Sequence, residues 1–178
     1  MAEELIDVVA YDGSPTGVRK AKSAIHRDGD WHVTVHLWIV TPDRRVLLQR
    51  RSLTKENYPG LWDVSVAGHI AAGEHPRDAF VREGLEEIGL AIDREAPRHI
   101  GRVREDLSLN GGTFLDRKIH EVYLLERDVD VTALQFRDAE VSDVALVPFA
   151  EFRARLDRDD PSLVPHAEEY ALLVRTLM

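Results

Sequence analysis

Short runs of apolar and β-branched residues alternate along the chain with segments whose apolar residues recur at helical spacing. Residues 31–40 (WHVTVHLWIV) predict a strand, and residues 45–51 follow a Thr-Pro-Asp turn and predict its hairpin partner. Further strands are expected at 5–10, 62–67, 100–107, 113–126 and 141–147.

The helical segments are marked by their ends as well as by their periodicity. Residues 75–87 predict a helix, because Pro76 suits its first position and Gly89 suits the position just past its end. A helical turn is expected at 20–26, and helices at 149–156 and 164–177. Strands and helices therefore interleave, which predicts an α/β fold with a mixed sheet covered by helices on both faces.

Composition narrows the class of protein. The 178 residues are 44% hydrophobic and 31% charged, which is typical of one globular domain. With 23 basic and 32 acidic residues the net charge is −9, so neither nucleic acid nor an anionic membrane is an expected partner. Cysteine is absent, which excludes disulfides, thiolate metal sites and cysteine nucleophiles. The acidic N-terminal segment lacks the features of a signal peptide, so we expect a cytoplasmic location.

The strongest chemical signal lies in residues 68–90, GHIAAGEHPRDAFVREGLEEIGL. Glu83, Glu86 and Glu87 are spaced so that their carboxylates share one helix face, where like charges repel. A hard divalent cation removes this conflict, and Mg²⁺ takes oxygen ligands while keeping water and substrate phosphates in its shell. The alternative is an acidic helix face that is simply solvated.

The surrounding residues decide between these readings. The segment resembles the signature of the Nudix hydrolase superfamily, Gly-x5-Glu-x7-Arg-Glu-U-x-Glu-Glu-x-Gly-U, in which U is a bulky apolar residue. The matching positions are Gly68, Glu74, Arg82, Glu83, Glu86, Glu87, Gly89 and Leu90. The first U is Gly84 here, and we expect a neighbour such as Phe80 to fill the space it leaves. The resemblance implies a Nudix-type α/β/α sandwich, with residues 1–30 as an N-terminal hairpin or extension and residues 31–178 as the hydrolase domain.

The resemblance also implies roles for these residues. Arg82 would orient a glutamate, and Glu74 would tie the loop to the helix. The general base differs within the superfamily, so Glu86 and Glu87 both stay candidates. The implied ligands of Mg²⁺, for which Mn²⁺ can substitute, are Glu83, Glu87, Glu86 and the carbonyl of Gly68.

Basic residues before this segment suggest a grip for a diphosphate, although exposed basic residues are common. Together with nearby histidines they resemble the type I isopentenyl-diphosphate isomerase branch of the superfamily. In that comparison Lys22, Arg51 and Lys55 match diphosphate-binding positions. The positions that match a metal site of the isomerases are His26, His32, His69 and the carboxylate of Glu121. A second carboxylate would fall at Ile119, which cannot ligate, so packing or hydrogen bonding is the alternative role of these histidines.

The isomerase chemistry itself does not carry over. The proton-transfer cysteine of that branch falls at Ala67, and its late tryptophan has no counterpart. The hydrolase acids are all retained. We therefore expect a diphosphate hydrolase acting on a nucleotide or another small organic diphosphate. The alternatives are an isomerase-like enzyme that uses another group and a non-catalytic module that senses a nucleotide.

The remaining candidates carry weaker signals. The segment 107–114 (LSLNGGTF) predicts a hairpin turn or a lid, and the helix at 164–177 either covers the sheet or forms a homodimer contact. Aromatic residues that either stack on a base or pack are Tyr58, Trp62 and Phe114. Histidines interpreted as surface or structural residues are His36, His75, His99, His120 and His166.

Overall fold

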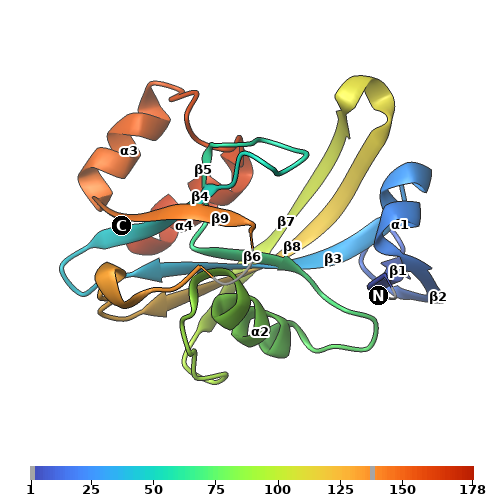
Figure 1. Ribbon diagram of the computed structural model, residues 1–178, viewed down its shortest axis with the longest axis horizontal. Coiled ribbons are helices and arrows are strands. Elements are labelled where there is room, and N and C mark those ends of the chain that lie inside the picture. Colours follow the sequence, from blue (N-terminus) through green and yellow to red (C-terminus); the bar gives the residue numbers. More distant parts are fainter. Residues whose placement is uncertain (1–2, 137–138) are drawn as a thin grey trace.

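The computed structural model describes residues 3–136 and 139–178 and shows a mixed β-sheet with helices on both faces (Figure 1). The strands are β1 (Leu5–Val9), β2 (Pro15–Ala21), β3 (Trp31–Val40), β4 (Arg45–Arg51), β5 (Trp62–Asp63), β6 (Val66–His69), β7 (Arg98–Leu109), β8 (Phe114–Glu126) and β9 (Val141–Pro148). The helices are α1 (Lys22–Asp28), α2 (Pro76–Ile88), α3 (Phe149–Asp157) and α4 (Ala167–Leu177), with 3₁₀ turns at Asn110–Gly112 and Val131–Ala133. The predicted fold class is confirmed.

The side chains of β3 alternate between two hydrophobic cores, as the period of a strand requires. Val35, Leu37 and Ile39 pack with Phe80 of α2 on one face. On the other face, the core that contains Trp38 and Val40 includes residues of α3 and α4. Figure 1 shows α2 on one side of the sheet and α3 and α4 on the other. The acidic helix is thus fixed to one face by its own apolar residues.

β3 and β4 separate almost at once after their turn, which differs from the predicted hairpin. The register pairs only Val40 with Val46, after which β3 runs parallel to β8 and β4 runs antiparallel to β9. Ser65 bridges the separating strands, because its hydroxyl donates to the Leu47 carbonyl (2.5 Å) and accepts from the Ile39 N–H (2.8 Å). This bridge breaks the single strand predicted at 62–67 into β5 and β6 and leaves an opening beside them.

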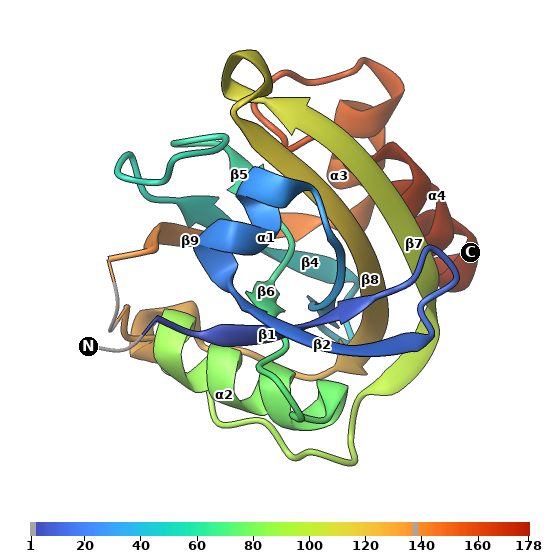
Figure 2. The ribbon, with the colours of Figure 1, turned by 90° about the vertical axis from the view of Figure 1, so that its right-hand side faces the viewer.

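The N-terminal segment forms an antiparallel hairpin, β1–β2, beside β3, followed by α1 (Figure 2). The sequence predicted a hairpin or extension over residues 1–30 but no bounds for β2, because most of its residues are exposed and no apolar alternation marks it. The helical turn expected at 20–26 begins later, at Lys22, since Lys20 and Ala21 still pair with β1.

α2 begins and ends where its sequence predicts. His75 caps it by accepting the Arg77 N–H at its Nδ1 (3.1 Å), and Gly89 ends it in the left-handed conformation at φ 69°. The space beside Gly84 is filled by Ile92, not by the expected Phe80: a Cβ at position 84 would lie 2.4 Å from Ile92 Cδ1. Ile92 follows the helix and folds back under it.

The last helix starts later than its periodicity suggests. α4 begins at Ala167 rather than at residue 164. Val164 precedes Pro165, and a residue that precedes proline disfavours the helical conformation. Among the described residues, no helix combines the length and apolar character needed to cross a membrane.

Candidate active site

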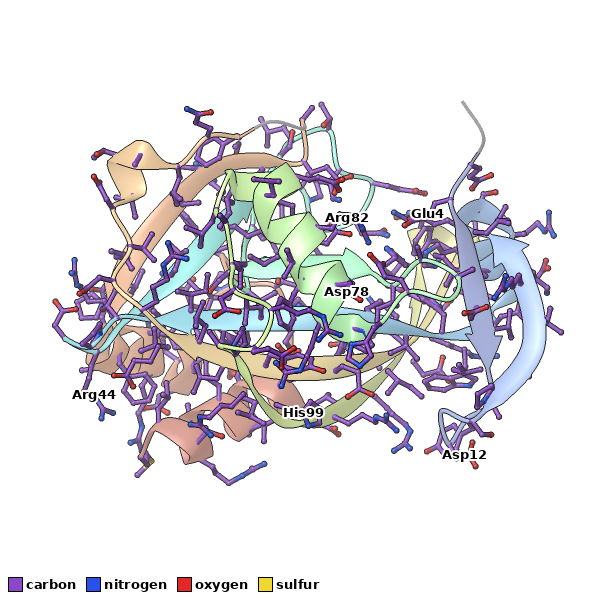
Figure 3. All side chains as sticks on the ribbon, turned by 90° about the horizontal axis from the view of Figure 1, so that it is seen from below. Glu4, Asp12, Arg44, Asp78, Arg82 and His99 are labelled. Atoms are coloured by element: carbon purple, nitrogen blue, oxygen red, sulfur yellow. The ribbon has the colours of Figure 1, made fainter. Side chains whose placement is uncertain are left out.

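The acidic residues of α2 extend from its exposed side, at Glu86, to its buried side, at Glu87. Ala79, Phe80 and Ile88 are buried on the inner face. Figure 3 shows α2 lying across the sheet, with Arg82 one turn beyond Asp78 along the helix. The segment from β6 to the start of α2 returns the chain past this helix, so residues of the loop and the helix meet.

Arg82 is the centre of a charged network that joins loop, strand and helix. Its Nε and Nη2 contact the two carboxylate oxygens of Glu74 at 3.0 and 2.9 Å, a bidentate pair. Its Nη1 contacts Glu83 Oε1 at 2.7 Å, and Nη2 also donates to the His69 carbonyl at 3.0 Å. Glu74 in turn accepts the Ala71 N–H at 2.9 Å. Arg82 and Glu74 therefore fix the position of Glu83 relative to β6.

Two glutamates of this helix, Glu83 and Glu87, lie close together, and the hydrogen-bond donors to Glu87 are uncharged. Glu87 is only 4% exposed, and its Oε2 lies 3.2 Å from both Gln49 Nε2 and the Ala67 N–H. Burial, and then the charge of Glu83, raise the pKa of Glu87 well above its ordinary value. Burial raises the pKa of Glu83 to about 7 although the adjacent Arg82 lowers it. The pair is therefore poised to gain a cation.

The backbone at Gly68 completes a fit for a hard dication. A Cβ on Gly68 would stand 2.2 Å from the carboxyl carbon of Glu83, so only glycine lets the strand approach this carboxylate. Carboxylate and carbonyl oxygens are the ligands that Mg²⁺ prefers. Glu86 lies at the more exposed end of the set, its side chain 54% exposed and 3.3 Å from Arg82 Nη1. The residues present thus fit Mg²⁺ or Mn²⁺.

A cavity of about 1050 Å³ opens beside these acids, and all the predicted diphosphate-binding residues line it. Gly68, Glu83 and Glu86 line it together with Lys22, Arg51 and Lys55. Tyr58 and Phe114 also line it, while Trp62 instead lies under the guanidinium of Arg50. One cavity therefore places predicted cation ligands and predicted phosphate-binding groups around the same space.

The basic residues of the cavity differ in the number of hydrogen bonds that they make to the protein. Arg51 contacts the Asn57 carbonyl at 3.0 and 2.8 Å and Asp63 Oδ2 at 2.9 Å. Lys55 pairs with Glu140. The partners of Arg51 make it part of the framework as well as of the cavity lining.

His26, His32 and His69 come together as the sequence comparison predicted. Their rings stand 5.1 to 5.5 Å apart, and one nitrogen of each lies within 4.8 Å of the others. The Nε2 atoms of all three have no hydrogen-bond partner among the described residues. Burial lowers the pKa of His32 to about 4 and that of His69 well below its ordinary value. Neutral imidazoles with free nitrogens are suited to metal binding.

Glu121 does not join these histidines, which corrects the sequence comparison. Its carboxylate contacts His99 Nε2 at 2.8 Å and also pairs with Arg102. Side chains alternate along β8, so Glu121 points to the opposite face from Asp116. Asp116 instead brings a carboxylate to the cluster, with Oδ1 3.4 Å from His26 Nδ1.

The sequence interpretation missed a second polar group of residues on the cavity floor. Three histidines read from the sequence as surface or structural are buried and adjoin charged residues there: His36, His120 and His166. Their neighbours at the cavity include Asp63, Glu105 and Lys118. The signal in the sequence was the alternation along β3, where Thr34 and His36 alternate with Val33, Val35 and Leu37; β8 carries no such clear pattern around Lys118 and His120. By contrast, His75 and His99 have the structural and surface roles expected of them.

Comparison with known proteins agrees with this geometry. Residues 30–167 match the model of the NUDIX domain family. The chain is 39% identical over 169 residues to Nudix hydrolase 3 of Arabidopsis thaliana, covering 93% of this chain but only 22% of the length of that protein. It is 28% identical over 177 residues to an isopentenyl-diphosphate Δ-isomerase of Brevibacterium linens, covering 96% of this chain and 93% of the isomerase.

Among solved structures, that of DR0079 from Deinococcus radiodurans superimposes with a TM-score of 0.72. The match covers 97% of this chain and 98% of the other at 22% identity, so it concerns the fold alone. The predicted resemblance to both the hydrolases and the isomerases is confirmed. The chain belongs to the NUDIX domain family.

Proposed function

We propose that the chain is a Mg²⁺-dependent hydrolase that cleaves a diphosphate linkage in a nucleotide or another small organic diphosphate. One observation carries this proposal: Glu83, which lies next to the buried Glu87, lines the same cavity as Lys22 and Lys55. A cation held by the acids and ammonium groups on the other side match the charge of a bound diphosphate.

The acidic residues would hold the cation, and one of them would also act as the general base. Glu83, Glu87, Glu86 and the Gly68 carbonyl would hold Mg²⁺, which when bound lowers the cost of developing charge on a diphosphate and of activating water. Glu86 is the more exposed acid, so it or Glu87 accepts the proton of the attacking water. Arg82 and Glu74 hold Glu83 in place through their paired contacts.

The cations on the facing wall would orient the diphosphate. Lys22 and Lys55 supply ammonium groups, that of Lys55 paired with Glu140. Arg51 supplies a guanidinium whose position is set by Asn57 and Asp63. The occupant of the cavity is accordingly a small anionic molecule.

An isomerase-like reaction is the second candidate from the sequence comparison, and the cavity floor favours hydrolysis over it. Ala67 replaces the cysteine that transfers a proton in the isomerases. Charged groups of Asp63, Glu105 and Lys118 face the cavity. A bare hydrocarbon chain placed there would desolvate these charges without offering hydrogen bonds. A polar substrate matches the floor better.

A non-catalytic sensor would need the same cavity but no intact acidic set. Glu83, Glu86 and Glu87 are all present, and Arg82 still fixes the first of them. Retaining Glu87, which is buried, next to the half-buried Glu83, both with raised pKa values, is unfavourable without a bound cation. The structure of the acidic face therefore supports a catalytic use.

We further propose that His26, His32 and His69, with Asp116 in place of Glu121, hold a second dication. The free Nε2 atoms support this role, and His32 Nδ1 donates to the Asp30 carbonyl at 3.2 Å, which leaves its Nε2 as the acceptor. Imidazole ligands favour a first-row dication such as Zn²⁺ or Mn²⁺.

A metal-dependent hydrolysis screen tests the function. The panel comprises nucleoside di- and triphosphates, dinucleotides, nucleotide sugars, thiamin diphosphate and prenyl diphosphates, each with and without Mg²⁺. We expect at least one member to be hydrolysed only with Mg²⁺ or Mn²⁺. Deuterium uptake by isopentenyl diphosphate in heavy water without phosphate release would support the isomerase instead. Tight ligand binding without turnover across the panel would support the sensor.

A further inference from the structure

Beneath the cavity, on the face of the sheet opposite α2, lies a second cluster of ligand-type side chains. Glu105 comes from β7, His120 from β8, and His166 immediately precedes α4. Glu105 Oε1 lies 2.7 Å from His166 Nδ1, and Glu105 Oε2 lies 3.1 Å from His120 Nε2. One donor atom of each residue lies within 4.8 Å of the others. Two paired strands and the start of a helix remote from them in the sequence thus bring two imidazoles and a carboxylate together.

Two of these atoms have no hydrogen bond of acceptable geometry within the described part of the chain. They are His120 Nε2 and Glu105 Oε2, and His120 is completely buried. Leaving buried polar atoms unpaired is unfavourable, so native structures normally satisfy them with protein, water or an ion. The 3.1 Å approach of these atoms is close enough for both to ligate the same ion.

The outer nitrogens of the two imidazoles are already engaged. His166 Nε2 contacts Asp63 Oδ1 at 3.1 Å, and His120 Nδ1 contacts Thr34 Oγ1 at 2.7 Å. A metal-binding histidine commonly donates its other ring N–H to such an oxygen, which fixes the ring and its tautomer. Asp63 and Thr34 therefore leave His166 Nδ1 and His120 Nε2 to face Glu105.

The local charge also favours a dication. Asp63, Glu105 and Glu169 are carboxylates that lie within ion-pair distance of His166, of His120 and His166, and of His36, respectively. The guanidinium of Arg51 neutralises Asp63. The negative charges of Glu105 and Glu169 then remain for the histidines to balance. Protonated imidazoles can do this, and so can one divalent ion. Lys118 is paired with Asp116 and does not alter this count.

We propose that Glu105, His120 and His166 form a metal site distinct from the acidic helix and from the cluster of His26, His32 and His69. Two imidazole nitrogens and a carboxylate suit Zn²⁺ or another first-row dication, whereas Mg²⁺ prefers oxygen ligands alone. Glu105 and His166 both line the cavity, so an ion here presents its remaining coordination positions to whatever the cavity binds. The site does not depend on the hydrolase proposal.

Zinc binding to the whole chain tests this site. A His69→Ala parent removes the other histidine cluster, and saturating Mg²⁺ occupies the acidic helix. We expect the parent, stripped with chelator and dialysed against Zn²⁺, to retain one zinc by elemental analysis. Adding His120→Gln or His166→Gln should remove it, and adding His99→Gln, which alters an exposed histidine on the other face, should not. Retention of zinc by both buried-histidine variants, or absence of zinc from the parent, overturns the proposal.

A second measurement uses the parent protein alone, so it tests the site even if the histidine variants do not fold. Zn²⁺ must displace the proton that His166 Nδ1 shares with Glu105. Calorimetric titration of the parent with Zn²⁺ in buffers of different ionisation enthalpy should therefore show the release of about one proton. Substituting Co²⁺ should give visible bands of a nitrogen- and oxygen-ligated ion. Zinc binding without proton release contradicts the assignment.

Discussion

The carboxylate of Glu83 occupies the space in which a side chain at position 68 would stand. A Cβ built on Gly68 would lie 2.2 Å from Glu83 Cδ and Oε1, closer than real contacts allow. The strand and the helix can therefore bring a backbone carbonyl and a carboxylate against one another only because residue 68 is glycine. This contact couples the first residue of the acidic segment to its central acid.

Gly68→Ala should displace Glu83 and lower kcat/KM at limiting Mg²⁺ by at least about tenfold, which corresponds to about 1.4 kcal/mol. The matched control is Gly84→Ala, whose added methyl meets the flexible end of Ile92 at 2.4 Å rather than a proposed metal ligand. Steady-state kinetics against Mg²⁺ concentration compare the two. Equal effects of both substitutions would mean that the Gly68 contact has no functional role.

Glu83→Gln should abolish most turnover yet stabilise the metal-free protein at neutral pH. Burial raises the pKa of Glu83 to about 7, so ionising it in the folded state costs at most about 3 kcal/mol, a cost that glutamine avoids. Because the folded pKa exceeds the unfolded one, metal-free wild type should lose stability as pH rises from about 4.5 to about 7.

Urea unfolding in chelator at pH 5 and pH 8 measures this difference. Glu86→Gln is the control, because that side chain is more than half exposed and its replacement should change stability little. A Glu83→Gln variant that is less stable than wild type at pH 8 would show that this carboxylate is not under strain.

Arg82→Lys should fail to replace the guanidinium. Arg82 contacts both oxygens of Glu74, one of Glu83 and the His69 carbonyl, a fork that a single ammonium cannot reproduce. We expect a loss of about 10- to 100-fold in kcat with a smaller change in KM, because a misplaced ligand affects the reaction more than substrate capture. Arg77→Lys on the same helix is the control, and full activity of Arg82→Lys would rule out the positioning role.

Substitution should divide the three basic residues of the cavity into residues that bind substrate and a residue that also stabilises the fold. Lys55→Ala and Lys22→Ala should raise KM severalfold with little change in melting temperature. Arg51→Ala should also destabilise the fold by about 2–4 kcal/mol, because Asp63 is buried and loses its guanidinium partner. Arg50→Ala, which alters a neighbouring arginine bonded to the Gly60 carbonyl, serves as the control. A stable Arg51→Ala variant would contradict the framework role.

Elements with strong local signals were predictable from the sequence. β3 has its expected bounds, since aromatic and β-branched residues are concentrated in it. α2 begins after His75 and ends at Gly89 because proline and glycine mark both ends. The acidic segment was equally predictable, since its side chains are adjacent on one helix.

Features that depend on tertiary pairing were not predictable from the sequence. β2 carries no apolar pattern and exists because β1 pairs with it. β4 leaves β3 for β9 because Ser65 bridges the strands at their divergence, which no local propensity reveals. Glu121 and Asp116 illustrate the same limit in the site: an offset that is odd along a strand reverses the face on which a side chain lies.

The most direct test is the rate of Mg²⁺-dependent hydrolysis by Glu87→Gln, measured on whichever diphosphate the screen identifies and beside a circular dichroism spectrum. Glutamine keeps the shape of the buried side chain and its contacts near Ala67 but removes its negative charge. We predict a native spectrum with turnover reduced by at least about a thousandfold, or roughly 4 kcal/mol. Wild-type turnover in the folded variant would contradict the assignment of the acidic helix as the catalytic centre.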